Sequence, residues 1–295
     1  MKILAIGDFH GRFPQKLLNK VKKLDFDIIV SPGDFCGNKK IEELFWKHCY
    51  GTDLNLSDVI EKKKYEKLET ENLGSGIRVI KKLSTLKKPI IGITGNWDPS
   101  KWREIGFSYS RESGRVGLVG RFNRVLKKIR NLKITDYKHT KFLNYVFVGY
   151  PRSTYPGKKV KHITKKFRKR FETKEEAKKA FRKMNSDNKK AFKKLKKHWR
   201  ANTIFISHNC PYNSKLDKLK KGPSRGKHYG SWLARKIIKE LKPELTICGH
   251  MHENQGKCKI GKTMIVNPGA ANEGKAAVID IDDKKRKVKS IKFLK

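Results

Sequence analysis

The chain has 295 residues, a mass of 34.2 kDa and a formal net charge of +44. It has no apolar run long enough to span a membrane, and its five cysteines form no Cys-x-x-Cys pair, which argues against a disulfide scaffold and favours a reducing compartment. The N-terminus turns acidic at Asp8, too soon for a signal peptide, so we expect a cytoplasmic protein with no membrane partner.

The first hundred residues alternate between short apolar runs and charged stretches. Three apolar runs, each predicted to be a strand, lie at 2–7, 27–32 and 89–94. Apolar residues at helical spacing predict a helix over 14–24, and the charged stretch 39–86 is predicted to be helical with breaks near Gly51 and Gly74. Strand, loop, helix and strand in this order predict an α/β sheet, in which ligands bind beyond the carboxyl ends of the strands.

The middle third carries most of the charge. Residues 101–200 hold 33 basic and 7 acidic side chains, and 156–200 alone holds 20 against 4. A capping box, Thr173-x-x-Glu176, and apolar residues at helical spacing predict one or two basic amphipathic helices there. We interpret 156–200 as a helical insertion in a single domain covering 1–295; a solvated, lysine-rich face is the alternative.

The remaining segments resume the first pattern. Residues 132–137 and 140–150 are predicted to be a strand pair. Further strands are predicted at 202–207, 245–248, 263–266, 276–281 and 288–293, with a helix at 230–241.

Five predicted strands end in short polar clusters. They are Asp8-Phe9-His10, Gly33-Asp34, Gly95-Asn96-Trp97-Asp98, Ser207-His208 and Gly249-His250-Met251-His252. Their carboxylate, amide and imidazole donors suit Mn²⁺, Fe or Zn²⁺ better than Ca²⁺ or a soft metal. They are too many for one ion, and a carboxylate can bridge two. Each cluster alone is also compatible with an ordinary turn or a structural histidine; their joint order predicts the metal site.

The order of these clusters resembles the calcineurin-like metallophosphoesterase superfamily. Within it, the segments 207–217 and 226–231 look most like the Icc-related phosphoesterases of archaea and bacteria. The resemblance runs from Lys2 to about Ile281 and leaves out 156–200 and parts of 40–86. It implies an α/β fold with a two-sheet β-sandwich flanked by helices. It also implies hydrolysis of a phosphodiester by direct attack of a hydroxide that bridges two metal ions.

The resemblance also implies a role for each polar residue. One ion would be held by Asp8, His10 and His252, the other by Asn96, His208 and His250, with Asp34 bridging both. The catalytic residues would be Asp34 and Asn96, because the Asn96 amide can also donate to a phosphate oxygen. The cofactors would be two divalent ions, Mn²⁺ in preference to Fe, Zn²⁺ or Ni²⁺.

One position departs from the pattern. Many members of the superfamily carry a histidine that protonates the leaving group where this chain has Trp97, and an indole cannot act as an acid near neutral pH. Losing a general acid costs about 10²–10⁴-fold, least for a good leaving group, which favours phosphodiesters over alkyl monoesters. Asp98 would then support the loop. Trp97 is either a stacking platform for a substrate base or a core or rim aromatic. His228 is either a substitute acid or phosphate contact, or a structural residue, which we favour.

Three functions are compatible with these residues. The first is a metal-dependent phosphodiesterase acting on a small or nucleotide ester. The second is a nuclease or nucleic-acid-processing enzyme that uses 156–200 to bind DNA or RNA, because aromatic residues are interleaved with its cations. Those aromatics are Phe167, Phe171, Phe181, Phe192 and Trp199. The third is a non-catalytic scaffold, against which a full set of ligands argues.

Overall fold

Two mixed six-stranded sheets and the helices around them make up the computed structural model, which describes the chain except for residues 50–51, 53, 55, 101–113, 154–172 and 221–223. The strands are β1 (Lys2–Ala5), β2 (Ile28–Ser31), β3 (Ile90–Gly92), β4 (Leu132–Ile134), β5 (His139–Phe142), β6 (Tyr145–Tyr150), β7 (Thr203–Asn209), β8 (Leu245–Gly249), β9 (Gly256–Ile260), β10 (Thr263–Asn267), β11 (Ala276–Asp282) and β12 (Lys287–Leu294). The α-helices are α1 (Gln15–Lys22), α2 (Lys39–His48), α3 (Leu56–Val59), α4 (Lys62–Ser84), α5 (Gly114–Lys128), α7 (Lys174–Lys196) and α8 (Trp232–Leu241); 3₁₀ turns cover His252–Asn254 and Ala271–Glu273.

The centre of each sheet is parallel. The first sheet has the order β12-β11-β1-β2-β3-β4 and the second β5-β6-β7-β8-β10-β9. Strands β1 to β4 run parallel to one another, as do β6, β7, β8 and β10, while β11, β12, β5 and β9 pair antiparallel at the outer positions. Because parallel strands end at the same edge, the loops that follow them meet there.

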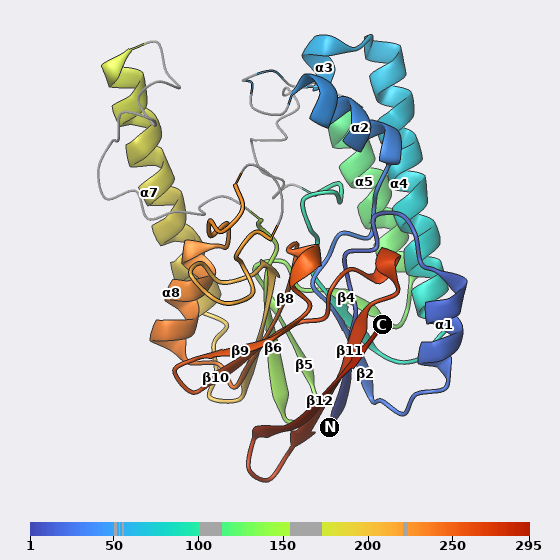
Figure 1. Ribbon diagram of the computed structural model, residues 1–295, viewed down its shortest axis with the longest axis vertical. Coiled ribbons are helices and arrows are strands. Elements are labelled where there is room, and N and C mark those ends of the chain that lie inside the picture. The colour runs from blue at the N-terminus through green and yellow to red at the C-terminus, as the bar shows by residue number, and fades with distance from the viewer. Residues whose placement is uncertain (50–51, 53, 55, 101–113, 154–172, 221–223) are drawn as a thin grey trace.

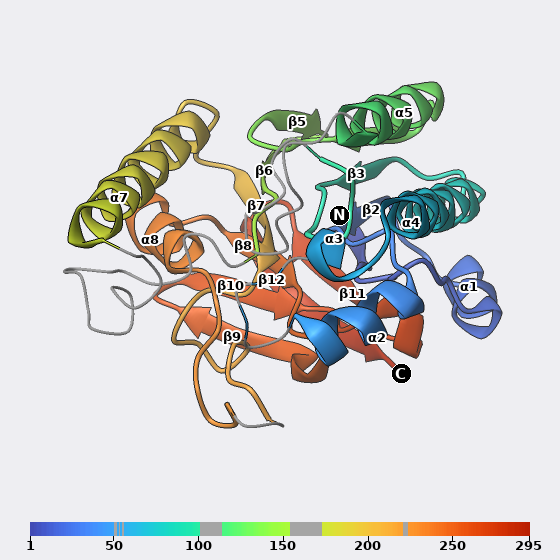
Figure 2. The same cartoon turned by 90° about the horizontal axis from the view of Figure 1, so that it is seen from above.

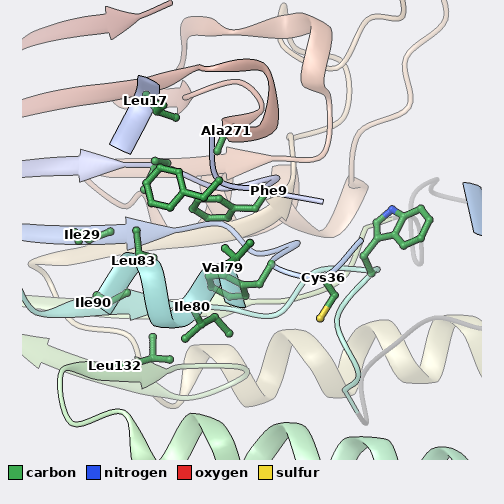
Figure 3. Packing of buried hydrophobic residues seen from close by; sticks show 14 of the residues in the cluster. Phe9, Leu17, Ile29, Cys36, Val79, Ile80, Leu83, Ile90, Leu132 and Ala271 are labelled. Carbon is green, nitrogen blue, oxygen red and sulfur yellow. The ribbon is translucent and has the colours of Figure 1, made fainter. Parts of the chain in front are cut away.

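Three apolar clusters hold the layers together. Side chains on the facing sides of the sheets, such as Ile3 and Ile206, form the core of the sandwich. The outer face of the first sheet packs against α1, α4 and α5, and that of the second sheet against α7 and α8 (Figures 1 and 2). Figure 3 shows one such layer, with Val79, Ile80 and Leu83 of α4 in the same cluster as Ile29 and Ile90 of the sheet. Alternate residues of the central strands face different clusters, so both faces of each are buried.

The α/β sandwich predicted from the sequence is confirmed, and two local predictions are wrong. Gly74 does not break a helix, because α4 continues through it, anchored by buried residues on both sides. Segments 132–137 and 140–150 are not one pair: β4 pairs with β3 in the first sheet, whereas β5 and β6 form a hairpin in the second. Helix α5 and strand β9 were not expected, and the predicted break near Gly51 lies outside the described residues.

The described part of the insertion is one helix. The Thr173 hydroxyl accepts a hydrogen bond from the Glu176 amide (3.1 Å), and the Glu176 carboxylate accepts one from the Thr173 amide (3.2 Å), so the capping box is confirmed. The C-terminal end of α7 is anchored by the buried Leu195, while its N-terminal end extends beyond the sheets (Figure 1). After α7, the Trp199 indole donates to the Leu241 carbonyl (2.8 Å), which is a packing role. Nucleic-acid binding by 156–200 stays a prediction, and 154–172 lies outside the described residues.

No helix in the described ranges is both long enough and apolar enough to cross a membrane.

Candidate metal centre

The strand-end loops bring six of the predicted ligands into two groups of three. In one group, donor atoms of Asp8, His10 and His252 all lie within 4.8 Å of one another. In the other, the same holds for Asp34, His208 and His250. Each group combines one carboxylate with two imidazoles, a donor set that suits a divalent transition-metal ion. Residues from opposite ends of the chain meet in the first group, where the Nε2 atoms of His10 and His252 are 2.9 Å apart.

Asp34 lies between the two groups. Its Oδ2 atom is 3.4 Å from Nε2 of His208 and 3.6 Å from Nε2 of His10. Its Oδ1 atom accepts a hydrogen bond from the Trp97 amide (2.8 Å), but the buried Oδ2 accepts none among the described residues. Leaving a carboxylate oxygen buried without a partner is costly, and cations on either side would supply that partner. The residues present therefore fit a pair of metal ions that share Asp34.

Asn96 joins the second group through its side chain. Its Oδ1 atom lies 2.8 Å from Nε2 of His208, so amide oxygen and imidazole nitrogen approach the same point. The other nitrogen of His208, Nδ1, lies 2.8 Å from the Pro32 carbonyl oxygen. A proton held at Nδ1 by that carbonyl leaves Nε2 as the coordinating atom, the usual way in which a neighbouring group fixes a metal-binding histidine.

The backbone at this edge is held in an unusual conformation. Asp8, His10, Asp34 and His250 have φ values of 52°, 45°, 54° and 67°, in the left-handed region that residues other than glycine rarely adopt. Such strain gathers at functional sites, where the surrounding structure enforces it. A Cβ atom at Gly95 would lie 2.1 Å from Oδ1 of Asp34, so only glycine lets this loop approach the carboxylate so closely.

Burial and nearby charges shift the pKa values of the two acidic ligands in opposite directions. Burial raises the pKa of Asp8 to about 6, although the charges of His252 and His208 oppose the rise. Burial also acts to raise the pKa of Asp34, but the nearby His208 and His10 and the hydrogen bonds it accepts outweigh that effect and hold its pKa well below the usual range. Asp34 is therefore ionised near neutral pH.

The pKa values of the histidines also shift in opposite directions. Burial lowers the pKa of His10 to about 4 and that of His250 to about 3, so both are neutral and have a free lone pair near neutral pH. Burial acts in the same direction on His208, but the charge of Asp34 outweighs it and raises the pKa of His208 to about 9. In the absence of a cation, His208 therefore carries the proton that partly balances the buried carboxylates.

Comparisons with known proteins give similarities in sequence and in fold. A family model described as "Metallophosphoesterase, calcineurin superfamily" matches residues 155–291. Over these residues the chain is similar to the calcineurin-like metallophosphoesterase superfamily. A curated relative, the uncharacterized protein MJ1162 of Methanocaldococcus jannaschii, is 38% identical over 69 residues, which cover 23% of this chain and 31% of that protein. The match thus spans about a third of the relative's length.

Two solved structures support the same fold. One crystal structure aligns over 100% of this chain and 99% of its own, with 19% identity and a TM-score of 0.65. That of TT1561 from Thermus thermophilus aligns over 99% of this chain and 97% of its own, with 17% identity and a TM-score of 0.52. At these identities the likeness shows the fold alone.

The structure places Trp97 and Asp98 beside the metal centre. The Trp97 ring is 9% exposed and meets the His10 ring edge-on, with centroids 5.6 Å apart. It therefore packs as a wall of the site. Asp98 accepts hydrogen bonds from the amides of Cys36 (2.9 Å) and Gly95 (2.8 Å), which fixes the loop that carries Asn96. Burial and the charge of Asp34 raise the pKa of Asp98 to about 7.

His228 does not join either group of donors. Its Nδ1 atom lies 2.7 Å from the buried carboxylate of Asp217, which also accepts hydrogen bonds from the amides of Asn213, Ser214 and Gly230. The Asn209 amide group donates to the Tyr229 carbonyl (3.0 Å) and so ties this loop to the end of β7. This arrangement is that of a histidine built into its own loop.

One supporting residue was missed by the sequence analysis. Both oxygens of Asp136 accept hydrogen bonds from Thr94, one from its amide (2.9 Å) and one from its hydroxyl (2.7 Å). Thr94 begins the loop that leads to Asn96, so Asp136 positions that loop. Burial raises the pKa of Asp136 to about 6, against the effect of the Thr94 hydrogen bonds. No sequence motif could reveal a pair 42 residues apart.

Proposed function

We propose that this chain is a metallophosphoesterase that hydrolyses phosphodiesters at a centre of two divalent metal ions. The single observation that carries the proposal is the buried Oδ2 atom of Asp34, which lies between His10 and His208 and has no hydrogen-bond donor among the described residues. In the absence of cations, the proton on His208, whose Nε2 lies 3.4 Å away, only partly balances this buried ionised oxygen.

The proposed ligands follow the two groups. Asp8, His10 and His252 would hold one ion; His208, His250 and Asn96 would hold the other, and Asp34 would contact both. When bound, two such ions activate water and neutralise charge that develops on the phosphoryl group. Imidazole, carboxylate and amide donors suit Mn²⁺, which we propose as the metal, with Fe, Zn²⁺ and Ni²⁺ as the competing ions.

Neighbouring residues of the chain would position the metal ligands and the substrate. The Pro32 carbonyl keeps the His208 proton on Nδ1. Asp98 fixes the Gly95 amide, so that the Asn96 side chain can also donate through its NH₂ group to a phosphoryl oxygen. The buried Trp97 ring excludes water from the side of His10 and offers no acidic proton. That lack favours diesters whose leaving group departs without being protonated, and it disfavours alkyl monoesters.

The test uses bis(p-nitrophenyl) phosphate, a diester with a good leaving group. Turnover should require added divalent metal, with Mn²⁺ most effective, and Asp34→Asn should abolish it while lowering the bound metal from two ions per chain to at most one. Asp25→Asn, which removes an exposed carboxylate far from the site, is the matched control and should leave both unchanged. Metal content is measured by mass spectrometry of the purified proteins. Turnover that survives in Asp34→Asn, or in metal-free wild-type protein, would refute the proposal.

A further inference from the structure

A cavity of about 550 Å³ opens next to the loop that carries Asn96. Its walls come from the C-terminal end of α5, from β4 and the turn that follows it, and from the end of α7. We call it the basic cavity, because five cationic side chains line it: Lys127, Arg130, Lys133, Lys138 and Lys194. A volume of this size lies in the range of cavities that hold small molecules.

The charge of the basic cavity is unbalanced. Among the described residues that line it, Asp136 is the one carboxylate, and both of its oxygens already accept hydrogen bonds from Thr94. Within the part of the chain that the structure describes, Lys127, Arg130 and Lys133 form no ion pair with an acidic side chain. Converging cations raise the local concentration of anions, and a guanidinium among them can bind a phosphate through two parallel hydrogen bonds.

The basic cavity adjoins the metal centre. Thr94 lines the cavity and precedes Asn96 by two residues, a span of at most about 7 Å even for a fully extended chain. Asp136 is close enough to His208 for that histidine's charge to act on its carboxylate. A molecule with one group at the metal centre can therefore place a second group among these cations.

We propose that the basic cavity binds a second phosphate group of the substrate. The substrate class is then a phosphate ester that carries a further phosphate, which deepens the function proposed above and rests on it. The cations select for that group, and the volume beyond one phosphate accommodates the part of the molecule that links the two. The second phosphate can belong to a small bisphosphorylated molecule or to the next phosphate of a nucleic-acid strand, since both present the same anion.

The test compares two double variants on α5 and the turn after it. Lys127→Gln/Arg130→Gln removes two cations that line the basic cavity. Arg124→Gln/Lys128→Gln removes two equally exposed cations of the same types that do not line it, and is the matched control. Both leave the metal ligands and the protein core untouched. The probes are thymidine 5′-monophosphate and thymidine 3′,5′-bisphosphate, titrated by calorimetry against Mn²⁺-loaded protein at constant ionic strength.

The wild-type protein should bind the bisphosphate about tenfold more tightly than the monophosphate, because charge-assisted hydrogen bonds are the strong ones. Lys127→Gln/Arg130→Gln should lose most of that ratio, and Arg124→Gln/Lys128→Gln should keep it. A ratio near one in the wild-type protein would overturn the proposal. A ratio retained in the cavity variant, or lost equally in both variants, would do so too.

This readout is independent of turnover. If no ester is hydrolysed with any metal, the proposed function fails, while the ratio of the two affinities still decides whether the basic cavity binds phosphate. A third probe, a single-stranded DNA of about eight nucleotides, separates the two sources. A larger loss of oligonucleotide affinity than of bisphosphate affinity in the cavity variant assigns the second phosphate to a strand. The reverse assigns it to a small molecule.

Discussion

The metal centre and the basic cavity lie side by side but hold their charged groups in different ways. At the metal centre, the carboxylates are buried, several ligands have left-handed backbone, and amides or carbonyls fix the side chains at one end. At the basic cavity, the cations are exposed and stand on α5, β4 and α7 at the ends of long, flexible side chains.

The difference separates two kinds of site. A centre held by buried backbone contacts depends on atomic position, so a single methyl group or a proton can disable it. A cavity held by exposed cations depends on net charge, so its function survives small displacements and weakens with salt. The four predictions below test this division, beginning with the largest effect.

The metal centre should respond steeply to pH. In the metal-free protein, the pKa of His208 is raised to about 9 and that of Asp8 to about 6, so each holds a proton below that pH. Both protons must leave before a cation can bind. The affinity for Mn²⁺ should therefore rise with pH, roughly tenfold per pH unit between pH 6 and 9, and more steeply below pH 6.

Competition with a fluorescent chelator measures this affinity at each pH. Thymidine bisphosphate should not show the same slope, because its second phosphate would contact the basic cavity and not these ligands. An affinity for Mn²⁺ that is flat between pH 6 and 9 would contradict the buried, protonated state of His208.

A methyl group at Gly95 should disable the metal centre. Its Cβ atom would lie 2.1 Å from Oδ1 and 2.6 Å from the backbone nitrogen of Asp34, so the carboxylate must move. Displacing a catalytic group by about 1 Å can cost roughly 10²-fold in rate. We expect Gly95→Ala to slow phosphodiester turnover by about 10²-fold and to lower the bound metal.

Gly117→Ala is the control for this change. Gly117 lies on α5, and a Cβ atom there would meet nothing within 4 Å. Alanine favours a helix over glycine by about 1 kcal/mol, so this variant should be at least as stable as wild type and fully active. Equal losses in the two variants would mean that the close approach at Gly95 has no special role.

The sequence predicts the metal centre better than its surroundings for a physical reason. Each proposed ligand directly follows or ends an apolar run, and parallel strands bring such positions to one edge, so local pattern and topology agree at Asp8, Asp34 and His208. The residues that position the ligand loops follow no such sequence pattern. Asp136 contacts Thr94 across 42 residues, and nothing in either neighbourhood marks the pair.

The errors in the fold have equally specific causes. Alternating apolar residues over 132–150 predict strands, but they do not indicate which sheet each strand joins. The chain passes from the first sheet to the second after β4. Gly74 costs α4 only about 1 kcal/mol, which the buried residues around it outweigh. Strand β9 alternates half-buried with exposed residues at a sheet edge, so its sequence, Gly-Lys-Cys-Lys-Ile, carries little apolar signal.

The third prediction concerns Asp136, which lines the basic cavity and positions the loop of the metal centre. Its pKa is raised from 3.8 to about 6 by burial, so the folded protein prefers the protonated form. The stability that this preference contributes is fully present below about pH 4 and is lost as pH rises through 6. Asp136→Asn cannot ionise, so its stability relative to wild type should rise between pH 4 and 6, on the order of 2 kcal/mol. Urea unfolding of both proteins in chelator at several pH values measures the difference; a difference that does not change with pH would contradict the prediction.

The smallest effect is expected at the outer end of α7. Thr173→Ala removes the hydroxyl that accepts from the Glu176 amide, and the loss of such a cap costs about 1 kcal/mol. Because this end of α7 extends beyond the sheets, amide exchange in its first turn should accelerate about fivefold while metal content and phosphodiester turnover stay at wild-type values (Figure 1).

Ser231→Ala removes the same kind of cap from α8, where Ser231 accepts from the Ala234 amide and the helix is buried against the second sheet. The cost of about 1 kcal/mol should there lower the unfolding free energy of the whole protein, because this helix does not open without its sheet. The same loss of a hydroxyl cap should therefore have a local effect on α7, which extends outward, and a global effect on α8, which packs in the core. If Thr173→Ala slowed turnover or released metal, α7 would belong to the rigid support of the metal centre. The division between the metal centre and the basic cavity would then fail.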